Sequence, residues 1–194
     1  RSGCPRRRSG VPRIDCTGVT APEARLTADV GSPSEPIAVE VSDPYDLLPR
    51  LHAEQCVAQA IAEIAILTPR EVIAPAGQAP AVLVIDIAPT GAAGSIEIVG
   101  VRSTTLLQPA DDGVRTPVLA LGVELSATGP TELRLPLLPN RCDAHALAED
   151  KVGTIIPFLV DAGGSEPVTW LMVLPDELKG GLYAYYAAYC ALPG

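Results

Sequence analysis

Turn segments divide the chain into short strand-like runs, and this feature constrains its fold most strongly. About nine runs carry alternating or β-branched apolar residues: 25–30, 37–41, 62–67, 81–87, 95–102, 118–125, 132–137, 154–160 and 168–174. Between them lie segments such as "GSPSEP", "APAGQAP" and "DAGGSEP", whose Gly, Pro, Asp and Ser residues are typical of turns. Short strands at this spacing favour a mainly β fold of the sandwich type over alternating strands and helices.

The order of strands and cysteines occurs twice along the chain. "CVAQAIAE" (56–63) and "CDAHALAE" (142–149) share their Cys, Ala and Glu positions, and each has two strand-like runs before it and two after it. We therefore predict two tandem immunoglobulin-like β-sandwiches with a short C-terminal helix. The expected division is a basic N-terminal arm at 1–21, a first sandwich at 22–108, and a second sandwich with the helix at 109–194.

Two segments have helical rather than strand-like patterns. "DPYDLLPRLHAEQ" (43–55) predicts a short helical turn in the first half. Near the C-terminus, apolar and aromatic residues follow the helical spacing i, i+3, i+4, i+7: Leu182, Tyr185, Tyr186 and Tyr189. This spacing predicts an amphipathic helix packed on the second sandwich, and a closing strand at "LYAYY" is the alternative.

The charge distribution argues against a nucleic-acid partner. The formal net charge is −9, and residues 1–13 contain five Arg and no acid, so the remainder of the chain is more acidic still. Such a body is repelled by a phosphate backbone. No apolar run approaches the length of about 18 to 20 residues that spans a bilayer, and we expect neither a membrane helix nor a signal peptide in this chain.

Five cysteines in a turn-rich, acidic chain indicate an exported protein with disulfides. If Cys56 and Cys142 occupy equivalent positions in two domains, each should find a local partner. Cys190 is then the natural partner of Cys142, and Cys16 can reach Cys56. The connectivity stays open at this point, since a Cys4–Cys16 bridge is also compatible with the sequence.

Cys4 is a candidate lipid anchor. "SGC" at 2–4 matches the end of the signal at which bacterial lipoproteins are cleaved and acylated, although Arg1 stands where that signal has an aliphatic residue. A bridge to Cys16 and a free thiol are the alternatives. Contact with a membrane is expected only through such an anchor.

The two histidines suggest a second hypothesis, a metal site. His52 precedes Cys56 by four residues and His145 follows Cys142 by three, which are spacings that zinc ligands use. Against this, the two histidines do not occupy equivalent positions in the repeated frame. The hypothesis is a metal- or small-molecule-binding protein with its site between the two domains.

No sequence motif of a known catalytic class is present. The chain lacks a G-x-S-x-G elbow, a Walker loop, a dinucleotide-binding glycine pattern and H-E-x-x-H. We therefore expect no enzymatic activity and no cofactor. A hydrolase with an unrecognised site would need a pocket where His and acidic groups converge.

The stretch "RCDAHALAEDKVGT" (141–154) resembles a group of uncharacterised exported or envelope-associated proteins of actinobacteria. Members of that group carry a similar Cys-Asp-x-His-Ala-x-Ala-Glu-Asp-Lys stretch ahead of a strand and a Cys near the C-terminus. The resemblance implies a location outside the cytoplasm and no particular activity. Together with the missing catalytic motifs, it leads us to expect a non-catalytic structural or protein-interaction module of the cell envelope, with a protein as its partner.

Overall fold

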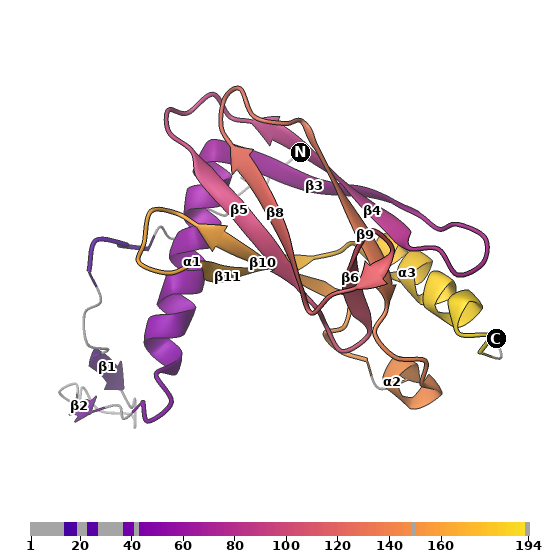
Figure 1. The fold of residues 1–194 in the computed structure, drawn as a ribbon. Coiled ribbons are helices and arrows are strands. Elements are labelled where there is room, and N and C mark those ends of the chain that lie inside the picture. Colours follow the sequence, from indigo (N-terminus) through magenta and orange to yellow (C-terminus); the bar gives the residue numbers. More distant parts are fainter. Residues whose placement is uncertain (1–13, 19–22, 27–36, 41–42, 149, 193–194) are drawn as a thin grey trace, which may run out of the picture. The chain divides into compact units, whose positions relative to one another are not determined.

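The computed structural model describes residues 14–18, 23–26, 37–40, 43–148 and 150–192 (Figure 1). Its contacts divide the chain into two compact units, residues 1–59 and residues 60–194. Helix α1 (Leu47–Ile64) begins in the first unit and ends in the second.

The first unit contains a two-stranded sheet and most of α1. Strand β1 (Glu23–Leu26) pairs antiparallel with β2 (Ile37–Glu40). Helix α1 starts where the Asp43 carboxylate accepts the backbone N–H of Leu47 at 2.9 Å and of Leu48 at 2.7 Å. These bonds, chiefly the one from Leu48, hold the pKa of Asp43 below its ordinary value. Side-chain capping of free backbone N–H groups thus fixes the start of the helix.

Helix α1 is longer than the helical turn that the sequence predicts. It has 18 residues and includes 62–64, which we expected in a strand at 62–67. The Ala-rich stretch 56–63 explains the difference, because Ala, Gln and Glu are strong helix formers and carry the helix past Cys56. The strand β3 (Ala65–Ile73) follows directly.

The second unit consists mainly of two antiparallel sheets, which confirms the mainly β prediction. The five-stranded sheet contains, in spatial order, β3, β4 (Ala81–Pro89), β9 (Glu132–Pro139), β6 (Leu107–Asp111) and β7 (Val114–Arg115). The four-stranded sheet contains β11 (Val168–Val173), β10 (Ile155–Asp161), β5 (Ile96–Arg102) and β8 (Val118–Leu125).

The core of this unit is built from the inward faces of the two sheets. Along the strands, buried apolar residues alternate with more exposed ones, as expected for sheets with one covered face. The buried residues include Leu83, Ile85, Ile98, Val101, Leu135, Leu137, Ile156, Phe158 and Val160. Phe158 stacks on Trp170 across the β10–β11 pair, with 5.9 Å between ring centroids.

The C-terminal segment forms helix α3 (Asp176–Tyr189), so the helical spacing of its tyrosines was the correct indication and the closing strand was not. Leu182, Tyr185 and Tyr186 are buried, and the helix packs against β3 and β9. The Tyr185 hydroxyl donates to the Ala79 and Leu137 carbonyls, at 2.9 and 3.2 Å. Burial raises the pKa of Tyr185 above its ordinary value.

The two tandem sandwiches are not what the structure shows. The predicted boundary after residue 108 falls inside β6, and each sheet takes strands from both sides of it. Strand β4 pairs with β9, and β5 lies between β8 and β10. The physical reason is that 60–108 supplies too few strands to cover the apolar residues of β4 and β5, so strands from beyond residue 108 complete both sheets.

The segment "QPADDGVRTP" (108–117), which contains the predicted boundary after residue 108, is a hairpin. Strands β6 and β7 pair through Ala110 with Arg115 and Asp111 with Val114. The turn residues Asp112 and Gly113 have positive φ angles of 47° and 79°. Asp-Gly is a preferred sequence for such tight turns.

Candidate functional site

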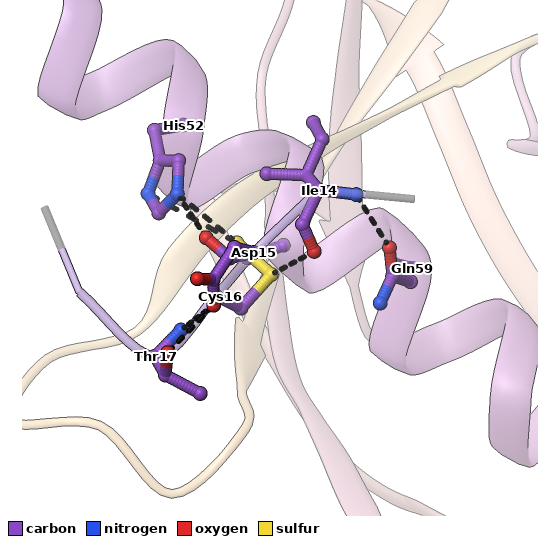
Figure 2. The surroundings of a disulfide bond; sticks show 7 residues. Ile14, Asp15, Cys16, Thr17, His52 and Gln59 are labelled. Atoms are coloured by element: carbon purple, nitrogen blue, oxygen red, sulfur yellow. Dashed lines mark hydrogen bonds between the residues drawn. A yellow bond between two sulfur atoms is a disulfide. The ribbon is translucent and has the colours of Figure 1, made fainter. Parts of the chain in front are cut away.

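The Cys16–Cys56 disulfide joins residues 14–18 to helix α1 (Figure 2). His52 lies one helical turn before Cys56, with Nε2 at 3.8 Å from the Cys56 Sγ atom. The same Nε2 atom donates to the Asp15 carbonyl at 2.8 Å. Because Cys16 is exposed, the disulfide is open to solvent with an imidazole beside one of its sulfur atoms.

The Cys142–Cys190 disulfide joins the segment after β9 to the end of α3. Next to it, the buried Tyr186 hydroxyl donates to the Arg141 carbonyl and accepts the backbone N–H of Asp143 at 3.2 Å. The disulfide and the tyrosine fasten the same two segments. The two disulfides are the two pairs that the repeated cysteine frame favoured.

The two disulfides remove the cysteine ligands that the metal hypothesis requires. Cys56 and Cys142 supply no thiolate ligands, because each is bonded to another cysteine. In the described part of the chain, no group of three or more His, Cys, Asp and Glu side chains is placed to hold a metal ion. His145 lies in the short helix α2 (Ala144–Ala148), where its backbone N–H donates to the Asp143 carboxylate. The candidate lipid anchor, Cys4, lies outside the described residues.

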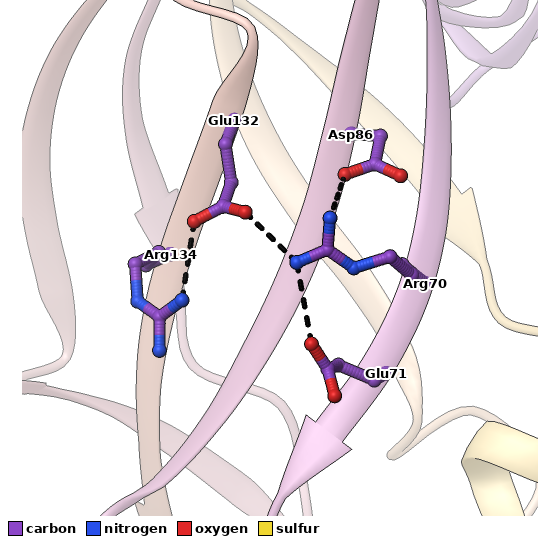
Figure 3. Close-up of polar contacts among 5 residues, drawn as sticks. All are labelled: Arg70, Glu71, Asp86, Glu132 and Arg134. Carbon is purple, nitrogen blue, oxygen red and sulfur yellow. Dashed lines mark hydrogen bonds and ion pairs between the residues drawn. The ribbon is translucent and has the colours of Figure 1, made fainter.

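The outward face of the five-stranded sheet is charged, and its charges pair with one another (Figure 3). Arg70 contacts Asp86 at 2.6 Å, Glu132 at 2.8 Å and Glu71 at 3.2 Å, and Arg134 contacts Glu132 at 3.1 Å. The bonds from Arg134 and Arg70 hold the pKa of Glu132 below its ordinary value. The network is solvated, and its two arginines contact all three carboxylates and leave a net charge of −1, so this face offers little to a partner.

The outward face of the four-stranded sheet is different, and we call it the apolar face. On β10 and β11, outward residues alternate with the buried ones and stand side by side in the register. The residues that form the face are Gly100, Arg102, Val118, Ala120, Ile155, Pro157, Leu159, Leu171 and Val173. Of these residues, Arg102 alone is charged; the same side of the sheet also has Thr169 opposite Leu159, and three carboxylates at its other end, described below.

Several apolar side chains on this face are exposed to solvent. Leu171 is 48% exposed, Val173 is 62% exposed and Val118 is 46% exposed. Single exposed apolar residues are common on proteins, but these lie on one side of a single sheet. Leu171 and Val173 are on the edge strand β11, and Val118 is on the opposite edge strand β8, in the same row as Leu171 with Pro157 and Arg102 between them. A contiguous exposed apolar surface is typical of a protein-binding site.

The apolar face ends at an open strand edge. Strand β11 is the last strand of its sheet, and none of the strands in the described ranges pairs with its free side. Proteins usually protect such edges with charged residues or prolines. The edge strand β3 of the other sheet has Pro69 and Arg70, whereas Val168–Val173 contains neither type of residue. The free side of β11 therefore has neither a paired strand among the described residues nor a charged residue or proline of its own.

A groove of about 630 Å³ opens at one end of the apolar face. Apolar side chains line one part of it and polar residues the other: Val152, Ile155, Pro157 and Leu171, then Ser103, Thr104, Thr105, Asn140 and Arg141. The polar part is held in place because Thr104 donates to the Gly153 carbonyl at 2.6 Å and Asn140 donates to the Thr104 carbonyl at 2.9 Å. The volume falls within the usual range of binding pockets.

Arg141 determines the electrostatics of the groove, since it is the one charged lining residue in the part of the chain that the structure describes. Its Nε lies 3.9 Å from the Asp143 carboxylate, and its side chain is 60% exposed. An ion pair this long and this exposed is weak. The groove therefore suits an occupant with apolar side chains next to an acidic group.

The opposite end of the four-stranded sheet is acidic. Asp161 stands opposite Glu97 in the register, and Glu97 stands opposite Glu124. Within the described ranges, neither Glu97 nor Glu124 has an ion-pair or hydrogen-bond partner. Like charges directly opposite each other on neighbouring strands destabilise a sheet. This acidic row therefore differs from the internally paired charges on the other sheet.

Sequence reasoning singled out the cysteines and missed the apolar face and the groove. One signal was present in "VTWLMVL" (168–174), which is apolar at nearly every position instead of every second one. A strand of that kind has two apolar faces, and only one of them can point into a two-layer core. The groove has no comparable signal, because its lining residues come from four separate segments.

Comparison with protein families, with curated proteins and with solved structures finds no match for this chain. No described helix has an apolar stretch long enough to span a bilayer. The two disulfides suggest an oxidising environment, as is found outside the cytoplasm.

Proposed function

We propose that this protein is a non-catalytic, exported protein-interaction module of the cell envelope, and that it binds its partner through the apolar face. The observation that carries the proposal is the exposure of Leu171, Val173 and Val118 on one sheet face. The groove and the open β11 edge adjoin that surface. An apolar centre with polar and charged residues at its rim is the usual composition of a protein interface.

The cysteines indicate that the protein is exported from the cytoplasm. Four of the five cysteines are joined in disulfides, which persist outside the cytoplasm and are rare inside it. The likeness of 141–154 to exported actinobacterial proteins supports the same location. Acylation of Cys4 would hold the protein at a membrane surface.

Site-specific crosslinking in the producing cell tests the proposal. A photo-reactive amino acid replaces Leu171 on the apolar face, and a matched control variant carries it in place of Ile66. Ile66 is 59% exposed and lies on the outward side of the other sheet. We expect protein adducts at position 171 and none at position 66. Equal adducts at both positions, or none at either, would contradict the proposal.

The size of the groove favours a second candidate function, the binding of a small amphipathic anion. At about 630 Å³ the groove is large enough for such a ligand, and Arg141 supplies the complementary charge. Extraction of the protein purified from its host, followed by mass spectrometry, distinguishes this function. A co-purifying anionic ligand that is lost in an Arg141→Glu variant would support it, and its absence from both would rule it out.

A further inference from the structure

We propose that the part of the partner which docks at the groove is an acidic peptide segment, in which an apolar side chain stands next to one or more carboxylates. The inference rests on the proposed function, because it names the chemistry that the apolar face and its groove select in a protein partner. Three features of the groove carry it: two arginines, hydrogen-bonding groups without partners, and exposed apolar side chains.

Arg102 brings a second arginine to the groove beside Arg141. One residue beyond the Phe158–Val101 pair, it stands next to Pro157, which lines the groove. Side chains of cross-strand neighbours lie on the same side of a sheet, about 5 Å apart, so Arg102 borders the same surface as Arg141. Arg102 is exposed, and within the described residues its guanidinium has no ion-pair or hydrogen-bond partner.

Arg141 is also free to bind a carboxylate from outside the chain. Its one ion-pair partner among the described residues is the Asp143 carboxylate at 3.9 Å, and that carboxylate also accepts the backbone N–H of His145 at 2.9 Å. A contact of this length at an exposed site is weak. Guanidinium groups bind carboxylates through two parallel N–H···O bonds. This end of the groove therefore favours a carboxylate over a neutral group.

The polar wall of the groove offers hydrogen bonds that suit a peptide main chain. The hydroxyls of Ser103 and Thr105 have no hydrogen-bond partner in the described part of the chain. Asn140 donates through Nδ2 to the Thr104 carbonyl at 2.9 Å, which leaves its Oδ1 atom as an acceptor without a partner among the same residues. Donors and an acceptor in one wall match the carbonyl and N–H groups of a peptide, and a fatty acid has no N–H group to offer.

Exposed apolar side chains complete the site. Leu171 and Val152 line the groove and are 48% and 56% exposed, and Val173, two residues beyond Leu171 on β11, is 62% exposed. An apolar side chain of the peptide would remove this surface from water, which is favourable. A segment with an apolar residue next to an acid therefore satisfies the apolar and the cationic parts of the groove together.

The acidic character of the chain does not prevent this binding. The formal net charge is −9, and the acidic row of Asp161, Glu97 and Glu124 lies at the other end of the sheet. Glu97 and Arg102 stand roughly 16 Å apart along β5, at the usual rise of a strand. Exposed charges are screened beyond about 8 Å at physiological salt, so the arginines dominate at the groove. The acidic row repels an acidic segment that approaches its own end.

Selection from a random peptide library displayed on phage, against the full oxidised chain, tests the inference. The original protein should enrich peptides in which Asp or Glu flanks an apolar residue. Arg141→Glu should enrich Lys or Arg at that place, because the charge that faces the peptide is reversed. The matched control is Arg50→Glu, since Arg50 is 67% exposed and has a similarly long contact of 3.8 Å, to Glu54. This control should select the same acidic peptides as the original protein.

Fluorescence anisotropy with one enriched acidic peptide measures the contribution of each arginine. Arg141→Glu and Arg102→Glu should each weaken its binding at least about tenfold, Arg50→Glu should not, and added salt should weaken it. A variant that selects basic peptides is folded, so the switch in selection separates lost contact from lost fold. Selection without a preference for acids, or of the same acidic peptides by Arg141→Glu, would overturn the inference.

Vesicle binding and crosslinking distinguish the remaining outcomes. If vesicles of phosphatidylglycerol and phosphatidylcholine bind through Arg141 while no peptide is enriched, the ligand is a lipid and the inference is wrong. If crosslinking at position 171 captures a protein but the enriched peptides lack acids, the inference is wrong and the proposed function stands. If neither crosslinking nor selection yields a partner, both are contradicted.

Discussion

Removal of the Cys142–Cys190 disulfide should lower the stability of the unit 60–194 substantially. The bridge joins residues 48 apart in the sequence. For a loop of that length, the chain-entropy relation gives a stabilisation of about 4 kcal/mol, because the bridge restricts the unfolded chain. For a unit of this size each kcal/mol moves the Tm by about 3 to 4 °C. The double variant Cys142→Ala/Cys190→Ala should therefore melt roughly 12 to 16 °C lower.

Thermal unfolding followed by circular dichroism, with calorimetry, measures this change. The control is Cys16→Ala/Cys56→Ala, which removes a bridge of similar span, 40 residues, that lies within the unit 1–59. The control should shift the unfolding of 60–194 less. A shift below about 3 °C for Cys142→Ala/Cys190→Ala would refute the reasoning, because the bridge would then constrain little of the unfolded chain.

Three further predictions concern single side chains. Tyr186→Phe removes the hydrogen bond to the Arg141 carbonyl and should lower the free energy of unfolding by about 1 to 2 kcal/mol in urea titrations; an unchanged value would contradict a structural role for the hydroxyl. The pKa of Asp43 is lowered in the folded protein, so its contribution to stability is present above the unfolded pKa near about 4 and is lost as the pH falls through the folded pKa. NMR titration should find its midpoint below that of a free Asp, and Asp43→Ala should lessen the acid sensitivity of α1. His52→Gln should slow reduction of the Cys16–Cys56 bond by an added thiol, since the His52 ring lies 3.8 Å from the Cys56 Sγ atom and can donate a hydrogen bond to the departing thiolate, and should leave the Cys142–Cys190 bond unaffected; equal rates in both proteins would refute this role.

Local patterns in the sequence predicted β4, β5, β8, β9, β10, β11 and α3 of the second unit, because each depends on nearby residues, whereas β6, β7 and most of β3 were not predicted. The run 118–125 is β8, and the tyrosine spacing near the C-terminus is α3. The pairing of strands depends on long-range packing that periodicity does not encode. Ile85 and Leu133, for example, are neighbours across the β4–β9 pair although the predicted domains separate them.

The repeated cysteine frame led to two disulfide pairs that the structure contains, even though the domain duplication behind it is absent. Cys56 lies within the long helix α1, and Cys142 lies before the short helix α2. The two positions are therefore not equivalent. The predicted disulfide pairs match the observed ones because each cysteine has a partner within its own compact unit, which local proximity favours.

The binding surface also depends on long-range packing, so it could not be predicted from the sequence. An exposed Leu171 and a buried Met172 look alike in an apolar run, and only the placement of the two sheets determines which side is covered.

Hydrogen exchange of the oxidised protein, alone and with a detergent extract of the envelope of the producing cell, tests the central claim, that the apolar face is the binding surface, most directly. The account predicts slower exchange in the presence of the extract in β8, β10 and β11, with β3 and β4 unchanged. Slower exchange confined to the five-stranded sheet, or no change in any strand, would contradict it.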